Sequence, residues 1–215
     1  MKTGIFIAFE GGENCGKSTI SEFLVKKLNG MGFPTIWTRE PGGTKCPVSE
    51  KIREIIIDPK NKICNISEAL LFSASRAQHI NKLILPSLKK GTNIVSDRFV
   101  LSSYVYQGIG RDLGIPVVKI INDLACEGLE PDITFLLDLD VKKGEERTPK
   151  KKKDRIERIK GSFHEDVRKG YLQLAKKDLK VIIIDAEQSE KKVCEEVLKY
   201  TLGTIKQKRR KCNGK

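Results

Sequence analysis

The stretch Ile5–Thr19 reads IFIAFEGGENCGKST and decides the fold. An apolar run with the length of a buried strand enters a glycine turn, and apolar residues at helical spacing begin at about Gly16. The segment Gly11–Ser18 matches G-x-x-x-x-G-K-[ST], a loop whose backbone N–H groups cradle phosphates at the N-terminus of a helix. We expect the whole loop, with Thr19 adjoining it, to bind the phosphates of a nucleotide: Gly11, Gly12, Glu13, Asn14, Cys15, Gly16, Lys17 and Ser18.

The loop also predicts the role of particular side chains. Lys17 is expected to bridge the β- and γ-phosphates, and the hydroxyl of Ser18 to coordinate Mg²⁺. Asp97 ends a later apolar run and is a natural direct or second-sphere partner of the same ion. Its alternative role is to cap the helix that follows. The sequence therefore predicts a nucleotide site that uses Mg²⁺.

Further along the chain, apolar runs of strand length alternate with amphipathic stretches of helix length. Strands are expected at 4–10, 34–38, 92–96, 132–139 and 180–185. Helices are expected at about 16–30, 48–57, 65–89, 101–108, 116–127, 163–178 and 190–207, with Pro86 kinking or splitting the third. This alternation predicts an α/β fold, a five-stranded parallel sheet with helices on both faces. The loops that follow the strands should meet at one edge of the sheet, where ligands bind in such folds.

Composition places the chain among ordinary globular proteins, since 39% of its 215 residues are hydrophobic and 32% are charged. The net charge of +13 is concentrated in two segments. Residues 142–160 hold ten Lys or Arg and four acidic residues, and residues 203–215 hold six Lys or Arg and no acidic one. Two short basic segments fit anion chemistry and a solvated terminus better than a face that binds a duplex. We therefore do not expect nucleic acid to be a partner.

The sequence also bears on the compartment. No apolar run approaches the roughly 20 residues of a membrane span, and the run that ends at Phe9 is shorter than a signal peptide requires. The six cysteines form no C-x-x-C pair and only two histidines are present, which favours free thiols over a zinc site. We expect a cytoplasmic protein with no membrane partner.

Five sequence blocks resemble the thymidylate kinase family, whose members phosphorylate dTMP with ATP. They follow the family's order within residues 5–185: Phe9–Thr19, Thr38–Thr44, Leu70–His79, Asp97–Gly108 and Asp154–Glu157. The combination of REPGGT at 39–44 with the D-R-F…Y-Q-G motif that begins at Asp97 is far more specific than the phosphate loop alone. The resemblance implies a P-loop kinase fold that converts ATP and dTMP, with Mg²⁺, into ADP and dTDP, and it implies a homodimer.

The resemblance also implies roles for individual side chains. Phe72 looks like the aromatic that stacks on thymine; from the residues alone it would be a core position on a long helix. Arg76 is similar to the donor to a thymine carbonyl, which disfavours cytosine because cytosine presents an amine there. Arg39 and Arg98 would clamp the acceptor phosphate. The full set of implied dTMP contacts is Arg39, Glu40, Phe72, Arg76, Arg98, Ser103, Tyr106 and Gln107.

One departure from the family concerns the lid. Some members carry an arginine within the phosphate loop, where this chain has Asn14, and others supply that charge from a mobile lid. The basic segment is expected to form such a lid at about 141–158, with Arg147 and Arg155 as candidates for the cation that offsets charge on the transferring phosphoryl group. The implied catalytic set is Lys17, Glu13, Arg98, Arg155 and Arg147.

The expected domain organisation is simple. One domain should cover residues 1–205, followed by a basic tail at 206–215 that we interpret as a disordered, solubilising end. The apolar helices around 66–88 and 101–125 are the candidates for a dimer interface.

Two alternative functions stay open at this point. The same scaffold could serve a kinase of another nucleotide or of a nucleoside, with Glu13 or Asp97 beside a 5′-hydroxyl. A P-loop switch protein that binds nucleic acid through its tail would instead show a salt-sensitive RNA shift that disappears on deletion of residues 206–215.

Overall fold

The computed structural model describes residues 3–147, 154–159 and 162–213. Five parallel strands form one sheet: β1 (Phe6–Gly11), β2 (Thr35–Arg39), β3 (Asn93–Asp97), β4 (Ile133–Asp138) and β5 (Val181–Asp185). Their order across the sheet is β2-β3-β1-β4-β5. The strand that enters the phosphate loop therefore lies in the centre, with Phe9 beside Asp97 on β3 and Phe135 on β4. The predicted α/β fold with a five-stranded parallel sheet is confirmed.

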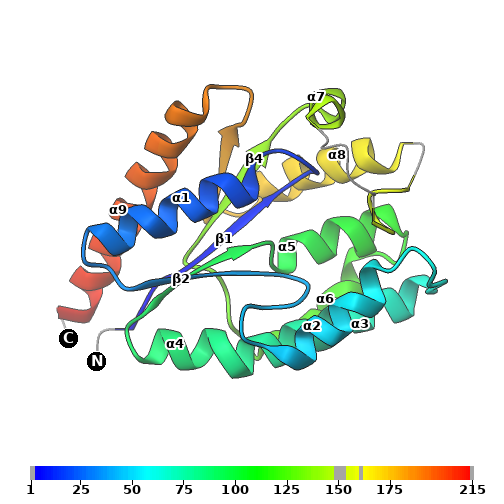
Figure 1. The fold of residues 1–215 in the computed structure, drawn as a ribbon, viewed down its shortest axis with the longest axis horizontal. Coiled ribbons are helices and arrows are strands. Elements are labelled where there is room, and N and C mark those ends of the chain that lie inside the picture. The colour runs from blue at the N-terminus through cyan, green and yellow to red at the C-terminus, as the bar shows by residue number, and fades with distance from the viewer. Residues whose placement is uncertain (1–2, 148–153, 160–161, 214–215) are drawn as a thin grey trace.

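Helices connect the strands (Figure 1). In chain order they are α1 (Lys17–Gly30), α2 (Pro47–Ile57), α3 (Asn65–His79), the π-helical η1 (Ile80–Ile84), α4 (Leu85–Lys89), α5 (Val100–Ser103), the π-helical η2 (Tyr104–Gly110), α6 (Ile115–Cys126), α7 (Val141–Glu146), α8 (Phe163–Ala175) and α9 (Glu190–Asn213).

Both faces of the sheet are covered. On one face α1 and α9 lie side by side over β1, β3 and β4 (Figure 1). Leu24 and Val197 are fully buried between these helices and the strands. The other face packs against the η1–α4 segment, η2 and α8, where Ile84 and Tyr171 are buried. Each large side chain buried in this way stabilises the fold by roughly 1.5–3 kcal/mol. These layers leave the carboxyl edge of the sheet to the loops.

The helix expected at 65–89 consists of three consecutive pieces, α3, η1 and α4. Pro86 stands at the start of α4, directly after the π-helical turns. Proline lacks an N–H and its ring clashes with the carbonyl four residues earlier, and the wider π-helix accommodates it. Pro86 therefore divides the helix, as expected, although by a change of helix type and without a break.

The segment expected as a lid begins with a helix, α7, that the sequence analysis missed. The side chain of Asp140 caps it by accepting a hydrogen bond from the backbone N of Lys142 at 3.0 Å. At Gly144 the helix approaches the phosphate loop so closely that a Cβ would lie 2.8 Å from the carbonyl oxygen of Glu13. The next part of the expected lid, 148–153, lies outside the described residues.

The last helix extends beyond its expected end near 207 and reaches Asn213. Lys208 Nζ lies 2.7 Å from a carboxylate oxygen of Asp132 and 3.0 Å from the carbonyl oxygen of Gly4. The guanidinium of Arg209 lies 4.8 Å from the centre of the Phe33 ring. These contacts hold the final turns against the amino end of the sheet, so the expectation of a disordered tail is wrong for residues 206–213.

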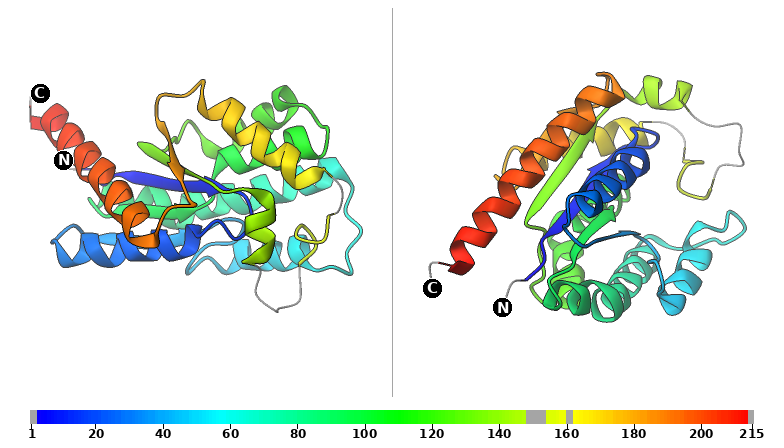
Figure 2. Two further views of the ribbon diagram at one scale, coloured as in Figure 1. Left: turned by 90° about the horizontal axis from the view of Figure 1, so that it is seen from above. Right: turned by 60° about the vertical axis from the view of Figure 1, so that its left-hand side comes forward.

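The two edges of the sheet differ in what they carry. Figures 1 and 2 show the start of β1 and the end of α9 at the amino edge, whereas the loop between β1 and α1 lies at the opposite, carboxyl edge. The loops after β2 and β3 also leave from the carboxyl edge, because all five strands are parallel. Among the described residues, no helix is both long and apolar enough to cross a membrane.

Candidate active site

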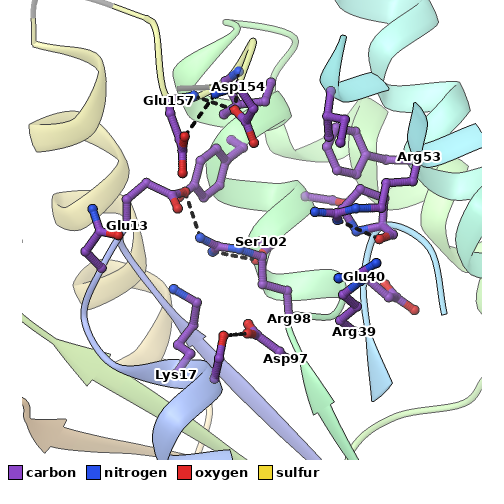
Figure 3. A pocket seen from close by; sticks show the side chains of 18 of the residues that line it. Glu13, Lys17, Arg39, Glu40, Arg53, Asp97, Arg98, Ser102, Asp154 and Glu157 are labelled. Atoms are coloured by element: carbon purple, nitrogen blue, oxygen red, sulfur yellow. Dashed lines mark hydrogen bonds and ion pairs between the residues drawn. The ribbon is translucent and has the colours of Figure 1, made fainter. Parts of the chain in front are cut away.

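A cleft of about 510 Å³ opens at the carboxyl edge of the sheet, between the loops that follow β1, β2 and β3. In Figure 3, Lys17 and Asp97 lie on one side of the cleft and Arg39 and Arg53 on the other, with Arg98 between them. Most of the predicted site residues border this cleft: Glu13, Asn14, Gly16, Lys17, Ser18, Thr19, Arg39, Glu40, Phe72, Asp97, Arg98, Ser103, Tyr106, Gln107 and Arg147.

Two positions of the phosphate loop require glycine. Gly16, directly before α1, has a φ of 93°, and a Cβ at Gly11 would lie 2.5 Å from the carbonyl oxygen of Leu137. Lys17 folds back over the loop, where its Nζ donates to the carbonyl oxygens of Gly12 at 2.5 Å and Gly11 at 3.3 Å. The ammonium group therefore lies beside the N-terminus of α1, which is where phosphate oxygens bind in loops of this kind.

Ser18 and Asp97 meet beside the loop although they are 79 residues apart: Ser18 Oγ donates to Asp97 Oδ2 at 2.6 Å. A hydroxyl and a carboxylate oxygen side by side are the hard donors that suit Mg²⁺, which uses few protein ligands in phosphate sites. The residues present therefore fit this ion. The alternative role for Asp97, capping α5, is wrong, because the N-terminus of α5 has no side-chain cap.

Glu13 lies at the centre of the charged cluster. Its Oε1 accepts hydrogen bonds from Arg98 Nη2 and from the hydroxyl of Tyr106, both at 2.7 Å. Burial alone would raise the pKa of Glu13, but the charges of Arg98 and Lys17 and the hydrogen bond from Tyr106 outweigh it and lower the pKa to about 2. The carboxylate is thus ionised at neutral pH and holds the Arg98 guanidinium in the cleft.

A second carboxyl group, Glu10, lies beneath Arg98 and was not predicted as functional. Its Oε1 accepts from the backbone N of Phe99 at 2.9 Å, and its Oε2 accepts from the hydroxyls of Ser102 and Tyr171. The Tyr171 hydroxyl in turn accepts from Arg98 Nη1 at 3.2 Å. Burial raises the pKa of Glu10 in spite of these bonds. The only signal in the sequence is that a charged residue interrupts the apolar strand just before the glycine turn.

Two cations face Lys17 from the opposite wall. Arg39 Nη2 pairs with Glu50 Oε2 at 3.1 Å, and Arg53 Nη1 donates to the carbonyl of Pro41 at 2.8 Å. Burial lowers the pKa of Arg53, and the neighbouring charge of Arg39 lowers it further. Two guanidinium groups held this close suit a doubly charged phosphate. Arg53 was not predicted as a site residue, because its only signal in the sequence is its place on the helix expected at 48–57.

Arg76 lies behind the cleft wall, with a side chain that is 2% exposed. Its Nε donates to Glu40 Oε2 at 2.7 Å and its Nη2 to the carbonyl of Phe99 at 3.2 Å. Its Nη1 donates to the hydroxyl of Ser103 at 3.0 Å and also to Oδ1 of Asn122. Ser103 borders the cleft and Arg76 does not. The structure therefore joins Arg76 to a predicted base-contacting residue and does not place it on the wall itself.

The other predicted contacts of the base and sugar come from α3 and η2. Phe72 is half-buried and borders the cleft one helical turn before Arg76. The Tyr106 ring lies 5.1 Å from the guanidinium carbon of Arg98, and the side chain of Gln107 donates to Glu68 at 3.0 Å. These side chains form one wall between the phosphate loop and α3.

The two candidate lid arginines lie in different places. Arg147 borders the cleft. Arg155 instead pairs through Nη1 with Glu68 at 2.7 Å and donates through Nε to the carbonyl of Ile56 at 2.7 Å. Glu68 is a buried carboxylate that the sequence analysis did not single out. The structure brings Arg147 to the border of the cleft, with its Nη1 donating to the carbonyl of Ala186 at 3.3 Å, and does not bring Arg155 there.

Comparisons with known proteins agree on one family. A model of the thymidylate kinase family matches residues 9–197. A thymidylate kinase of Halothermothrix orenii is 45% identical over 94% of this chain and 98% of its own length. One of Caldanaerobacter subterraneus is 46% identical over 86% of this chain and 88% of its own length. The crystal structure of thymidylate kinase from Ehrlichia chaffeensis superposes with a TM-score of 0.72 at 31% identity, covering 93% of this chain and 99% of that one.

Proposed function

Since the chain belongs to the thymidylate kinase family, it phosphorylates dTMP with ATP as the donor, and we propose that the cleft at the carboxyl edge of the sheet is where this transfer takes place. The observation that supports this location most strongly is the division of cations between two walls. Lys17 and the N-terminus of α1 lie on one side, and Arg39 and Arg53 lie on the other. Two phosphate compounds can therefore bind face to face.

On the donor side, the phosphate loop holds the triphosphate. Backbone N–H groups of the loop and the ammonium of Lys17 bind its oxygens and orient the terminal phosphate toward the opposite wall. Ser18 and Asp97 would hold Mg²⁺, which would offset negative charge on the phosphates of the donor. No covalent intermediate is needed, because positioning and charge stabilisation supply the catalysis.

On the acceptor side, Arg39, Arg53 and Arg98 fix the monophosphate so that one of its oxygens is aligned with the donor phosphate. Guanidinium groups bind phosphates through paired N–H···O bonds, which set orientation as well as affinity. Glu13 orients Arg98 through the 2.7 Å ion pair. The acceptor base lies toward Phe72, Ser103 and Gln107.

For the lid, Arg147 is the cation that we assign to the transferring phosphoryl group, because it borders the cleft. An arginine in this role contributes about 10³–10⁵-fold in rate in phosphoryl-transfer enzymes. Arg155 then has a different part: it anchors the segment 154–159 to Glu68 and to the end of α2. Closure of such a segment also limits water access and suppresses hydrolysis of ATP.

A coupled ADP-release assay tests this assignment. ATP and Mg²⁺ are supplied with dTMP, dUMP, dCMP, dGMP or thymidine in parallel, and the wild-type chain is compared with Arg53→Ala and Arg147→Ala. We expect release with dTMP, a raised KM for dTMP in Arg53→Ala, and a lowered kcat in Arg147→Ala. Equal turnover of dCMP would contradict the thymine pocket, and an unchanged kcat in Arg147→Ala would contradict the lid assignment.

Apolar side chains exposed on α3 and α6, two helices that pack against each other, support a homodimer. These two helices expose a set of large apolar side chains: Ile66, Leu70, Val117, Ile120 and Leu124. Leu124 is 78% exposed and Ile120 is 65% exposed, which is unusual for neighbouring aliphatic residues on one helix unless a partner covers them. In sedimentation velocity, Ile120→Glu with Leu124→Glu should convert a dimer into a monomer. The matched control is Leu179→Glu, since Leu179 is fully exposed elsewhere on the chain; a wild-type monomer would contradict the proposal.

We also propose that the protein is cytoplasmic. Cys15, Cys46, Cys64, Cys126 and Cys194 are free thiols, which is typical of a protein of the reducing cytoplasm.

A further inference from the structure

The side chain of Arg76 is held from several directions at once. Its guanidinium donates to acceptors on four segments: Glu40 after β2, Phe99 before α5, Ser103 on α5 and Asn122 on α6. A guanidinium group is planar and its donors have fixed directions, so these acceptors together determine where each N–H points.

On one side of the Arg76 guanidinium, Glu40 belongs to a row of hydrogen-bonded side chains. Glu40 Oε1 lies 3.1 Å from His79 Nδ1, and His79 Nε2 lies 2.7 Å from the hydroxyl of Thr38. The loop packs tightly here, because a Cβ at Gly43 would lie 2.5 Å from the His79 ring. Glu40 therefore has a fixed orientation and holds Nε of Arg76 in place.

On the other side of the guanidinium, Asn122 fixes the orientation of Arg76. Its side chain is buried, its Oδ1 accepts from Arg76 Nη1 and, at 3.4 Å, from the hydroxyl of Ser73, and its Nδ2 donates to the carbonyl of Val118 at 2.8 Å. Because the amide nitrogen is engaged with its own helix, the amide oxygen must face Arg76. Asn122 does not border the cleft, and no step of the proposed transfer uses it.

The effect of this arrangement appears at Ser103. A serine hydroxyl has one hydrogen and two lone pairs, and one lone pair of Ser103 already accepts from Arg76 Nη1 at 3.0 Å. The hydrogen of Ser103 therefore points away from Arg76, and Ser103 borders the cleft. A donor at this position suits the keto oxygen of thymine at C4 and opposes the amine of cytosine, which is itself a donor.

We propose that Asn122 is a positioning residue for base selection: with Glu40 it fixes the Arg76 guanidinium, and Arg76 in turn holds Ser103 as a hydrogen-bond donor to the pyrimidine. This inference rests on the proposed function, because it requires that dTMP is the acceptor. It adds a specificity role to the inner face of α6, whose outer face carries Ile120 and Leu124.

The test compares dTMP and dCMP binding by calorimetry, in the absence of ATP, for the wild type, Asn122→Ala and Asn122→Asp. Asn122→Ala leaves a buried N–H of Arg76 without its acceptor, so we expect the Kd for dTMP to rise about tenfold and the preference for dTMP over dCMP to fall several-fold. Asn122→Asp keeps an acceptor of the same shape, and we expect its preference to stay within about threefold of the wild type even where its stability is lower.

The matched control is Asn93→Ala. Asn93 is also buried and its amide accepts from the backbone N of Ile5 at 3.0 Å and donates to Thr35 at 3.2 Å, but it lies at the amino end of β3, at the far end of the sheet. This variant should lower the thermal midpoint without changing the dTMP to dCMP ratio.

The possible outcomes distinguish failure of the positioning role of Asn122 from failure of the proposed function. An unchanged ratio in Asn122→Ala, with a stability loss like that of Asn93→Ala, would overturn the positioning role and leave the proposed function intact. An equal loss of preference in Asn122→Ala and Asn122→Asp would also overturn it, because the acceptor would not be what matters. A wild-type chain that neither binds dTMP nor releases ADP with it would overturn the proposed function, and the inference with it.

Discussion

Two glutamate–arginine pairs flank the cleft with the same spacing and with different surroundings. Arg98 and Glu13 are 2.7 Å apart and are 15% and 30% exposed. Arg76 and Glu40 are also 2.7 Å apart, but they are only 2% and 3% exposed. The first pair borders the cleft from the phosphate loop and the end of β3, whereas in the second pair Glu40 borders the cleft and Arg76 lies behind its wall.

This difference in exposure indicates that one pair can bind the substrate, whereas the other can only hold the shape of the site. A pair that is open to water can exchange one partner for a phosphate, because the released carboxylate stays hydrated. A buried pair cannot do so, since separating it leaves an uncompensated charge in the interior. We propose that Arg98 acts on the substrate directly and that Arg76 holds its neighbours in place. Changes at the two pairs should therefore affect different measured quantities.

The largest expected effect is on catalysis, in Arg98→Ala. Loss of this guanidinium removes charge stabilisation at the transferring phosphate and should lower kcat/KM for dTMP by about 10³-fold. The thermal midpoint should fall less than in Glu40→Ala, because the partner Glu13 is partly exposed. Steady-state kinetics and thermal unfolding measure the two quantities. Arg111→Ala is a matched control, since Arg111 is also partly exposed and pairs with Glu68 at 2.9 Å; a loss below tenfold in Arg98→Ala would contradict a direct role.

The next effect is on stability, in Glu40→Ala. Removing one partner of a buried ion pair typically costs about 3–5 kcal/mol, and we expect the free energy of unfolding to fall by that amount. Glu13→Ala should cost less than Glu40→Ala, because its pair is partly exposed. Urea denaturation of both variants measures the difference. Equal losses in the two variants would show that burial does not distinguish the pairs.

A smaller effect concerns acid stability. The pKa of Glu13 in the folded chain is lowered from 4.5 to about 2, so the ionised form stabilises the folded state above pH 4.5 and this contribution is lost as the pH falls toward 2. Substitution by Gln removes a titrating group, so the stability difference between the wild type and Glu13→Gln should be constant above about pH 5 and shrink between 4.5 and 2. Chemical denaturation at several pH values measures it; a difference that does not vary with pH would contradict the lowered pKa of Glu13.

The comparison of the two pairs also shows which parts of the site the sequence predicts. The Glu13 side of the site was predictable, because the phosphate loop is contiguous and the end of β3 supplies Asp97 and Arg98 in one motif. Local spacing and the strand–loop–helix context are enough to predict such a loop. The parallel sheet followed from the alternation of strands and helices, for the same reason.

The Arg76 side was less predictable, because its geometry depends on contacts between distant segments. The role of Asn122 requires α6 to pack on α3, and the place of Arg155 requires Glu68, far earlier in the chain. Arg53 was missed because a cation on an amphipathic helix carries no local signal of what it faces. Periodicity predicts which face of a helix is buried, but not which loop approaches it.

The smallest effect, and the sharpest distinction between the pairs, is the response to salt. Added salt shortens the Debye length from about 10 Å at 0.1 M to about 3 Å at 1 M, and it screens exposed charges far more than buried ones. We expect the coupling energy of Glu13 and Arg98, measured by a double-mutant cycle of Glu13→Gln and Arg98→Met, to fall by a few tenths of a kcal/mol between these conditions. The corresponding cycle of Glu40→Gln and Arg76→Met should give a larger coupling energy that salt does not change. A buried pair that weakens with salt as much as the open one would mean that water reaches Arg76, and the division between a binding pair and a shaping pair would then fail.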